Sequence, residues 1–279
     1  MLARFSNSWA LVKASADVLR MDKELMIFPV FSAIGAVLVM VSFVAPLWAT
    51  GGWQILAAEG GGGYAAWVVG FLFYLANYFV VFFFNAALVG AALIRMDGGD
   101  PTVSDGLSLA FSRIGSILGY AALAATVGMV LRLIAERSGF LGKLVAGLAG
   151  IAWTLGTYLV VPVLVSRNVG AVDAVKESAA LFRRTWGEQV VGNFGLGWAV
   201  GLMAVSWTLA SAAALWALAH LGGAAVLVGL SGALLGYAFL AVFASALKGV
   251  YTAALFRYAE RGDAGAFDGR VVAAAFRPR

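Results

Sequence analysis

Long apolar stretches alternate with short polar segments along the chain, and this pattern predicts its helices. A helix rises about 1.5 Å per residue, so about 20 apolar residues cross the hydrocarbon core of a bilayer, which is about 30 Å thick. Six stretches meet or approach that length: 25–48, 64–94, 114–135, 144–166, 190–219 and 224–256. We therefore predict an all-α fold, a polytopic membrane helix bundle of six transmembrane helices. The second, fifth and sixth stretches exceed the required length, so they must tilt, kink or project beyond the membrane.

Shorter amphipathic helices are predicted in the polar segments 4–22, 103–113 and 171–186. In each, apolar residues recur every three or four positions, which places them on one helical face. The three stripes are Phe5, Trp9, Val12, Ala16 and Leu19; Val103, Leu107, Ala110 and Ile114; and Val172, Val175, Ala179, Phe182 and Trp186. Thr102 and Asp105 fit a helix cap at the start of the middle segment. Because each amphipathic helix precedes two spans, the chain has the form of a threefold helix-plus-hairpin repeat.

The apolar faces of these helices have two alternative partners. Basic amphipathic helices lie in the membrane interface with the apolar face in lipid, and their cations then meet anionic head groups. Alternatively, the helices pack on the ends of the spans as a cytoplasmic cap. Under the first alternative, the membrane-interface contacts are Trp9, Lys13, Arg20, Arg183, Arg184 and Trp186.

The basic residues are concentrated on one side of the predicted spans. Fifteen of the nineteen Lys and Arg residues lie within 4–23, 95–113, 167–184 and 257–279. If each apolar block between these segments is a hairpin, all four segments share one membrane face, and the positive-inside rule makes that face cytoplasmic. Both termini are then cytoplasmic, and 257–279 is a cytoplasmic tail. With 62% hydrophobic and 12% charged residues, the composition is that of a multi-pass membrane protein.

The residue types present exclude several classes of chemistry. The chain has no cysteine and a single histidine, His220, so cysteine nucleophiles are excluded and a clustered metal site is not expected. We predict neither enzymatic activity nor a cofactor. The basic residues adjoin apolar spans, so nucleic acid is not needed to explain them. The expected partners are anionic membrane lipids and either a second copy of the chain or another membrane protein.

Lys248 is the best single candidate for a functional residue. An ionisable group inside a span is costly and marks a functional site by default. Two depths are open, because 224–247 already suffices to cross the bilayer and the amine of Lys248 can then snorkel to the cytoplasmic interface. If Lys248 lies inside, Asn193 and Asn85 are at a similar depth. The three residues then form a candidate site for an anion or a lipid head group.

Several motifs resemble an uncharacterised family of prokaryotic six-span integral membrane proteins. They are Phe5-Ser6-Asn7-Ser8-Trp9, Lys13-Ala14-Ser15, Val18-Leu19, Asp22-Lys23-Glu24-Leu25, Phe28-Pro29, Thr157-Tyr158, Val161-Pro162-Val163, Ser178 and Trp186-Gly187. The chain is also distantly similar to membrane domains attached to glycerophosphodiester phosphodiesterases, although nothing matches their catalytic part. The resemblance implies a prokaryotic cytoplasmic (inner) membrane and supplies no catalytic residue.

Two functional hypotheses follow. The leading one is a non-enzymatic scaffold, assembly partner or membrane organiser whose interfacial helices bind anionic lipid. The alternative is a transporter or lipid-handling protein with a cavity near Lys248, Asn193 and Asn85. These hypotheses differ in one observable, since only the second requires Lys248 to face a polar pocket at membrane depth.

Overall fold

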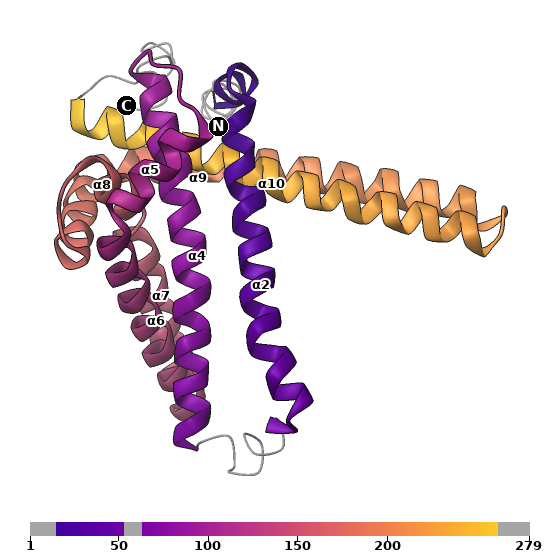
Figure 1. Cartoon of the computed structure of the whole chain (residues 1–279), viewed down its shortest axis with the longest axis horizontal. Coiled ribbons are helices and arrows are strands. Elements are labelled where there is room, and N and C mark those ends of the chain that lie inside the picture. Colours follow the sequence, from indigo (N-terminus) through magenta and orange to yellow (C-terminus); the bar gives the residue numbers. More distant parts are fainter. Residues whose placement is uncertain (1–14, 53–62, 262–279) are drawn as a thin grey trace.

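The structure is a computed structural model that describes residues 15–52 and 63–261, without the side chains of 184–196 and 261. Within these ranges all regular elements are helices (Figure 1). The described residues 15–21 are helical. The elements that follow are η1 (Lys23–Met26), α2 (Ile27–Ala49), α4 (Tyr64–Met96), α5 (Val103–Ser112), α6 (Ile114–Arg137), α7 (Gly139–Gly156), α8 (Val160–Ser166), α9 (Ala171–Ala219) and α10 (Gly223–Arg261).

The six predicted spans are confirmed as six helices that are long and apolar enough to cross a membrane. Four of the six form a bundle in which α2, α4, α6 and α7 run alongside one another (Figure 1). Helix α4 is central, since it packs against α2 on one side and α6 on the other. The cytoplasmic side predicted from the basic residues corresponds to the end of the bundle where α2 begins and α4 ends.

The core of the protein lies at that same end of the bundle. Most of α4 between Phe83 and Met96 is buried, and the run is rich in alanine and glycine, which lets neighbouring helices approach closely. Helix α5 packs here, and its Gly106 faces α4. A β-carbon added at Gly106 would lie 2.7 Å from the carbonyl oxygen of Ala87, so only glycine allows this approach.

The fourth span is broken near its C-terminal end. Helix α7 ends at Gly156 and α8 begins at Val160, two residues before Pro162. The buried hydroxyl of Ser178, on α9, accepts a hydrogen bond of 3.0 Å from the backbone N–H of Leu159. Ser178 thereby satisfies a polar backbone group that lipid could not, which is the condition for irregular backbone within a membrane span.

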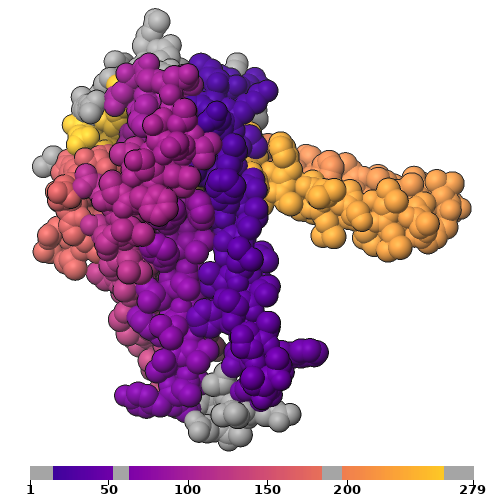
Figure 2. All heavy atoms as spheres, in the orientation of Figure 1, coloured from indigo at the N-terminus to yellow at the C-terminus, as the bar shows by residue number. Residues whose placement is uncertain are grey.

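Helices α9 and α10 form a hairpin that projects sideways from the bundle (Figures 1 and 2). The second half of α10 packs across the core, with Ala246, Leu247 and Val250 fully buried, and its first half continues outward with α9 beside it. Trp207 of α9 donates a hydrogen bond of 3.1 Å from Nε1 to the carbonyl of Ala233. No charged residue lies between 197 and 247, so the hairpin is suited to hydrocarbon throughout.

The three amphipathic segments bury much of each predicted stripe. Leu19, Ala110 and Phe182 are buried, one from each stripe. Four further stripe residues pack against the core: Ala16, Val103, Leu107 and Val175. Val172 and Ile114 depart from the prediction, since both are exposed. In the described part of these segments, the buried residues belong to the protein core, as in a cap over the ends of the spans.

Candidate ligand pocket

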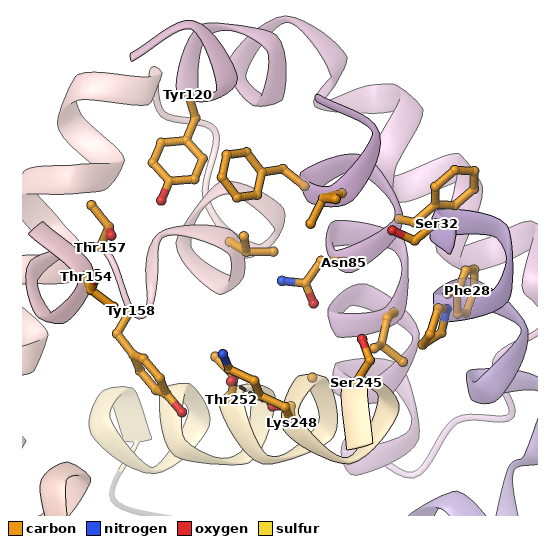
Figure 3. Close-up of a pocket in the computed structure, with 17 residues that line it drawn as sticks. Phe28, Ser32, Asn85, Tyr120, Thr154, Thr157, Tyr158, Ser245, Lys248 and Thr252 are labelled. Atoms are coloured by element: carbon orange, nitrogen blue, oxygen red, sulfur yellow. Dashed lines mark hydrogen bonds between the residues drawn. The ribbon is translucent and has the colours of Figure 1, made fainter. Parts of the chain in front are cut away.

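A cavity of about 300 Å³ lies where α10 crosses the bundle (Figure 3). Its walls come from α2, α4, α6, α7, α8 and α10, together with the break between α7 and α8. Apolar walls are formed by residues such as Phe28, Val81, Phe84 and Leu88. The polar side chains are Ser32, Asn85, Tyr120, Thr154, Thr157, Tyr158, Ser245, Lys248 and Thr252.

Lys248 and Asn85 both point into this cavity (Figure 3). Lys248 is exposed and Asn85 is half-buried. Among the described lining residues Lys248 carries the single full charge, and no Asp or Glu is present. The cavity is therefore electropositive.

Gly249 explains how Lys248 comes to lie beside Asn85. A β-carbon at Gly249 would approach Cδ2 of Leu88 to 2.3 Å and Oδ1 of Asn85 to 3.6 Å. The missing side chain thus allows α10 to cross α4 in direct contact, and the preceding residue, Lys248, is directed into the cavity. The dipeptide Lys248-Gly249 carried a signal for this crossing in the sequence, because small residues mark close approaches between membrane helices.

Three threonines in the cavity wall donate their hydroxyl protons to the backbone of their own helices. Thr154 donates to the carbonyl of Gly150 (2.8 Å), Thr157 to that of Trp153 (2.8 Å) and Thr252 to that of Lys248 (2.7 Å). A hydroxyl has one proton and two acceptor lone pairs. These oxygens therefore act as acceptors, and those of Thr157 and Thr252 also interact with the hydroxyls of Tyr120 and Tyr158.

The other predicted site residues are placed as follows. Asn193 lies in α9, and its side chain is outside the described set, as are those of Arg184 and Trp186. Trp9 and Lys13 precede the described residues. Arg20 is exposed and lies 3.7 Å from Asp17, and Arg183 is exposed. The structure thus brings Lys248 and Asn85 together and leaves the third member of the predicted set undetermined.

Ion pairs hold the C-terminal end of α10 beyond the cavity. Arg257 on α10 pairs with Asp97 at 2.6 Å, and Glu260 pairs with Arg167 at 3.0 Å. Arg167 also pairs with Glu177 on α9 at 3.0 Å. The hydrogen bond to Glu260 raises the pKa of Arg167 above its ordinary value. Helix α10 is thus held at its C-terminal end by ion pairs and across the bundle by apolar packing.

The hydroxyl-bearing residues of the cavity were not singled out by the sequence pattern. Ser32, Tyr120, Thr157, Ser245 and Thr252 come from four different spans. The available signal was weak, since these residues share only a position within about twelve residues of a basic residue at the end of the span. Within the described ranges, no group of three or more His, Cys, Asp or Glu residues is arranged to hold a metal ion.

Six apolar membrane-length helices define a multi-pass membrane protein of the helix-bundle class, with the cavity near the end of the bundle where α2 begins. The chain belongs to a family of unknown function, DUF6159, whose pattern matches residues 64–267. The predicted membership of an uncharacterised family is confirmed. The matched region begins after the opening motifs at 5–29 and includes the later ones, from Thr157-Tyr158 to Trp186-Gly187. No curated protein matches the chain.

Proposed function

We propose that this protein is a lipid-handling membrane protein that binds an anionic head group in the cavity around Lys248 and Asn85. The observation that supports the proposal is the charge of the cavity, which contains the Lys248 ammonium and no described carboxylate. A cation without a counter-charge in a partly enclosed site favours an anionic ligand. The proposed function is binding or transfer, without enzymatic chemistry.

The depth of the cavity supports a ligand that comes from the bilayer. Asn85 precedes Arg95 by ten residues of α4, which corresponds to about 15 Å along a helix. Ser32 follows Lys23 by nine residues, and Tyr120 follows Arg113 by seven, which corresponds to about 10 to 14 Å. If these basic residues mark the head-group level, the cavity lies within the cytoplasmic leaflet. A lipid head group can enter at this depth.

The break between α7 and α8 supports the same proposal. Transporter sites are commonly formed by discontinuous membrane helices. Here the break contributes Thr157 and Tyr158 to the cavity wall, and Ser178 holds its backbone. The irregular backbone therefore lines the cavity rather than facing lipid.

Lipid retention by the purified full-length protein tests this function. The variant Lys248→Gln should bind anionic phospholipid about tenfold or more weakly, because a charge-assisted hydrogen bond contributes about 1.5–3 kcal/mol. Lys143→Gln is the matched control, since Lys143 is an exposed lysine of the fourth span outside the cavity. Equal retention of anionic lipid by both variants would contradict the proposal.

A scaffold or assembly role is the second candidate, and the projecting hairpin favours it. Trp198, Leu209 and Trp216 of α9 are each more than half exposed, so another membrane helix can pack there. Binding of anionic lipid by the cytoplasmic segments belongs to the same candidate. Charge reversal at Arg183 and Arg184, or Trp→Ser at positions 9 and 186, should then weaken lipid association and complex formation. Unchanged association in both variants would exclude this role.

The orientation in the membrane is a separate proposal. The basic segments favour cytoplasmic termini, and the family resemblance favours a prokaryotic inner membrane. Loops at 49–63, 136–143 and 220–223 are then on the outer side.

A further inference from the structure

The hydrogen-bonding capacity of the cavity narrows the chemistry of its ligand. Resting on the anionic-ligand function proposed above, we infer that the ligand is a phosphodiester with a polyhydroxyl head group, of the phosphoglycerol type. The ligand carries one negative charge for Lys248 and hydroxyl donors for the threonine oxygens. It has no ammonium group.

The charge of the cavity favours a ligand with one negative charge. Lys248 supplies one positive charge, and no described lining residue supplies a negative one. A phosphodiester carries one negative charge and matches this balance. A zwitterionic head group would place an ammonium near Lys248 without a carboxylate partner, and like charges at short range repel.

The direction of the threonine hydrogen bonds favours a head group that carries hydroxyl groups. Thr154, Thr157 and Thr252 donate their protons to backbone carbonyls at 2.7 to 2.8 Å, so their oxygens face a ligand as acceptors. Thr157 and Thr252 also interact with the hydroxyls of Tyr120 and Tyr158, so Thr154 is the acceptor without such a neighbour. A phosphate diester without hydroxyl groups has no proton to donate to these oxygens. The hydroxyl protons of a glycerol moiety complement acceptors on α7, in the break after it and on α10.

The size and position of the cavity favour a lipid head group. A volume of about 300 Å³ is at the lower end for small-molecule pockets, so it holds a head group without its acyl chains. The chains can extend along the apolar wall formed by Phe28, Val81 and Phe84, where Val81 is 42% exposed. The same head-group chemistry also occurs in water-soluble glycerophosphates, and the experiment distinguishes these two sources.

Competitive lipid binding to the full-length protein, measured by native mass spectrometry from mixed micelles, tests the inference. Equimolar phosphatidylglycerol, phosphatidic acid, phosphatidylserine and phosphatidylethanolamine are offered together. We expect phosphatidylglycerol to be retained about three- to tenfold more than the others, which corresponds to one or two net hydrogen bonds. Lys248→Gln should lose this retention, and Lys248→Arg should keep it.

Two threonine variants separate head-group selection from charge attraction. Thr154→Val and Thr157→Val remove an acceptor oxygen at nearly constant shape and should reduce the preference for phosphatidylglycerol about threefold. Their binding of phosphatidic acid should not change. The control is Thr126→Val, because Thr126 makes the same kind of bond to Ala122 on α6 outside the cavity.

The outcomes distinguish this inference from the function on which it rests. Equal binding of all anionic lipids, lost in Lys248→Gln, would overturn the polyhydroxyl preference and leave the anion site intact. Retention of every lipid by Lys248→Gln would overturn both. If soluble glycerophosphoglycerol competes as well as the lipid, the head-group chemistry is supported and the ligand enters from water. If it competes only at much higher concentration, the ligand is the lipid.

Discussion

Gly249 of α10 and Leu88 of α4 lie so close that a β-carbon on the glycine would come within 2.3 Å of Leu88 Cδ2. This contact fixes the point at which α10 crosses the bundle, and Lys248 enters the cavity from that point. The cavity therefore depends on an apolar contact next to it as much as on its polar residues.

Gly249→Ala should destabilise the protein through this contact. The added methyl group must displace the Leu88 side chain, and overpacking of this kind costs about 1–3 kcal/mol. Thermal unfolding in detergent should show a lower Tm. Gly201→Ala is the control, because nothing lies within 4 Å of a β-carbon at Gly201, and alanine favours the helix. A Tm for Gly249→Ala equal to that of the control would contradict the close contact.

Ser178→Ala should destabilise the break between α7 and α8. The variant leaves the backbone N–H of Leu159 without the hydroxyl that accepts its hydrogen bond at 3.0 Å, and an unsatisfied buried donor costs about 1–3 kcal/mol. Hydrogen exchange at Leu159 should accelerate, and the Tm should fall. Ser231→Ala provides the comparison, since the Ser231 hydroxyl is exposed and bonds only to its own helix. Unaltered exchange at Leu159 would mean that Ser178 does not hold the break.

Stability should depend on pH through the cap of α5. Hydrogen bonds from the backbone N–H and the hydroxyl of Thr102, at 2.9 and 2.7 Å, lower the pKa of Asp105 below its ordinary value of 3.8. A carboxylate with a depressed pKa stabilises the folded state fully above the ordinary value, and this contribution is lost as the pH falls through the lowered pKa. Asp105→Asn should therefore reduce the Tm at pH 7, and the deficit should shrink below pH 3.8.

Thermal scans of both proteins from pH 7 to pH 3 provide this measurement. Thr102→Ser keeps the hydroxyl and serves as the control, with nearly wild-type behaviour. A Tm difference between wild type and Asp105→Asn that stayed constant over the whole range would show that the charge of Asp105 does not contribute.

The absence of cysteine makes the membrane orientation directly measurable. Single cysteines introduced at Gly61, Gly139 and Gly222 should react with a membrane-impermeant thiol reagent added outside the cell. A cysteine at Met1 or Arg279 should react only after permeabilisation. If the cysteine at position 61 did not react with the reagent in intact cells, the hairpin topology would be wrong.

Position 222 tests the course of the projecting hairpin in particular. No charged residue lies between 197 and 247 on either of its helices, whereas helices that lie in the interface have a polar face. We therefore expect the tip at 222 to reach the outer side. Protection of this residue in intact cells, together with labelling at 61, would place the whole hairpin within one leaflet.

The six spans could be predicted because their cause is local. A run of about 20 apolar residues must be helical in lipid, whatever it contacts. The cap of α5 was equally local, since Thr102 and Asp105 are three residues apart, and the structure forms the complete capping box. Lys248 and Asn85 could be paired because each is a conspicuous polar residue within an apolar span.

The remaining features depend on contacts between distant residues. Ser178 is a buried polar residue off the hydrophobic stripe, and its hydroxyl accepts a hydrogen bond from Leu159, nineteen residues earlier. The sideways course of the hairpin follows from the continuity of α10 through its crossing of the core. No periodicity contains either relationship. The threonines of the cavity could not be predicted either, because their role depends on a contact with a distant helix. Thr154 and Thr157 resemble ordinary helix residues until α10 is placed beside them.

Helix α10 also links the cavity to the end of the bundle where the basic residues lie. Arg257 follows Lys248 by nine residues, or about two and a half helical turns. Both cations belong to one continuous helix, and Arg257 pairs with Asp97 outside the cavity. If a ligand draws Lys248 inward as proposed, the change in α10 should therefore reach the pair between Arg257 and Asp97.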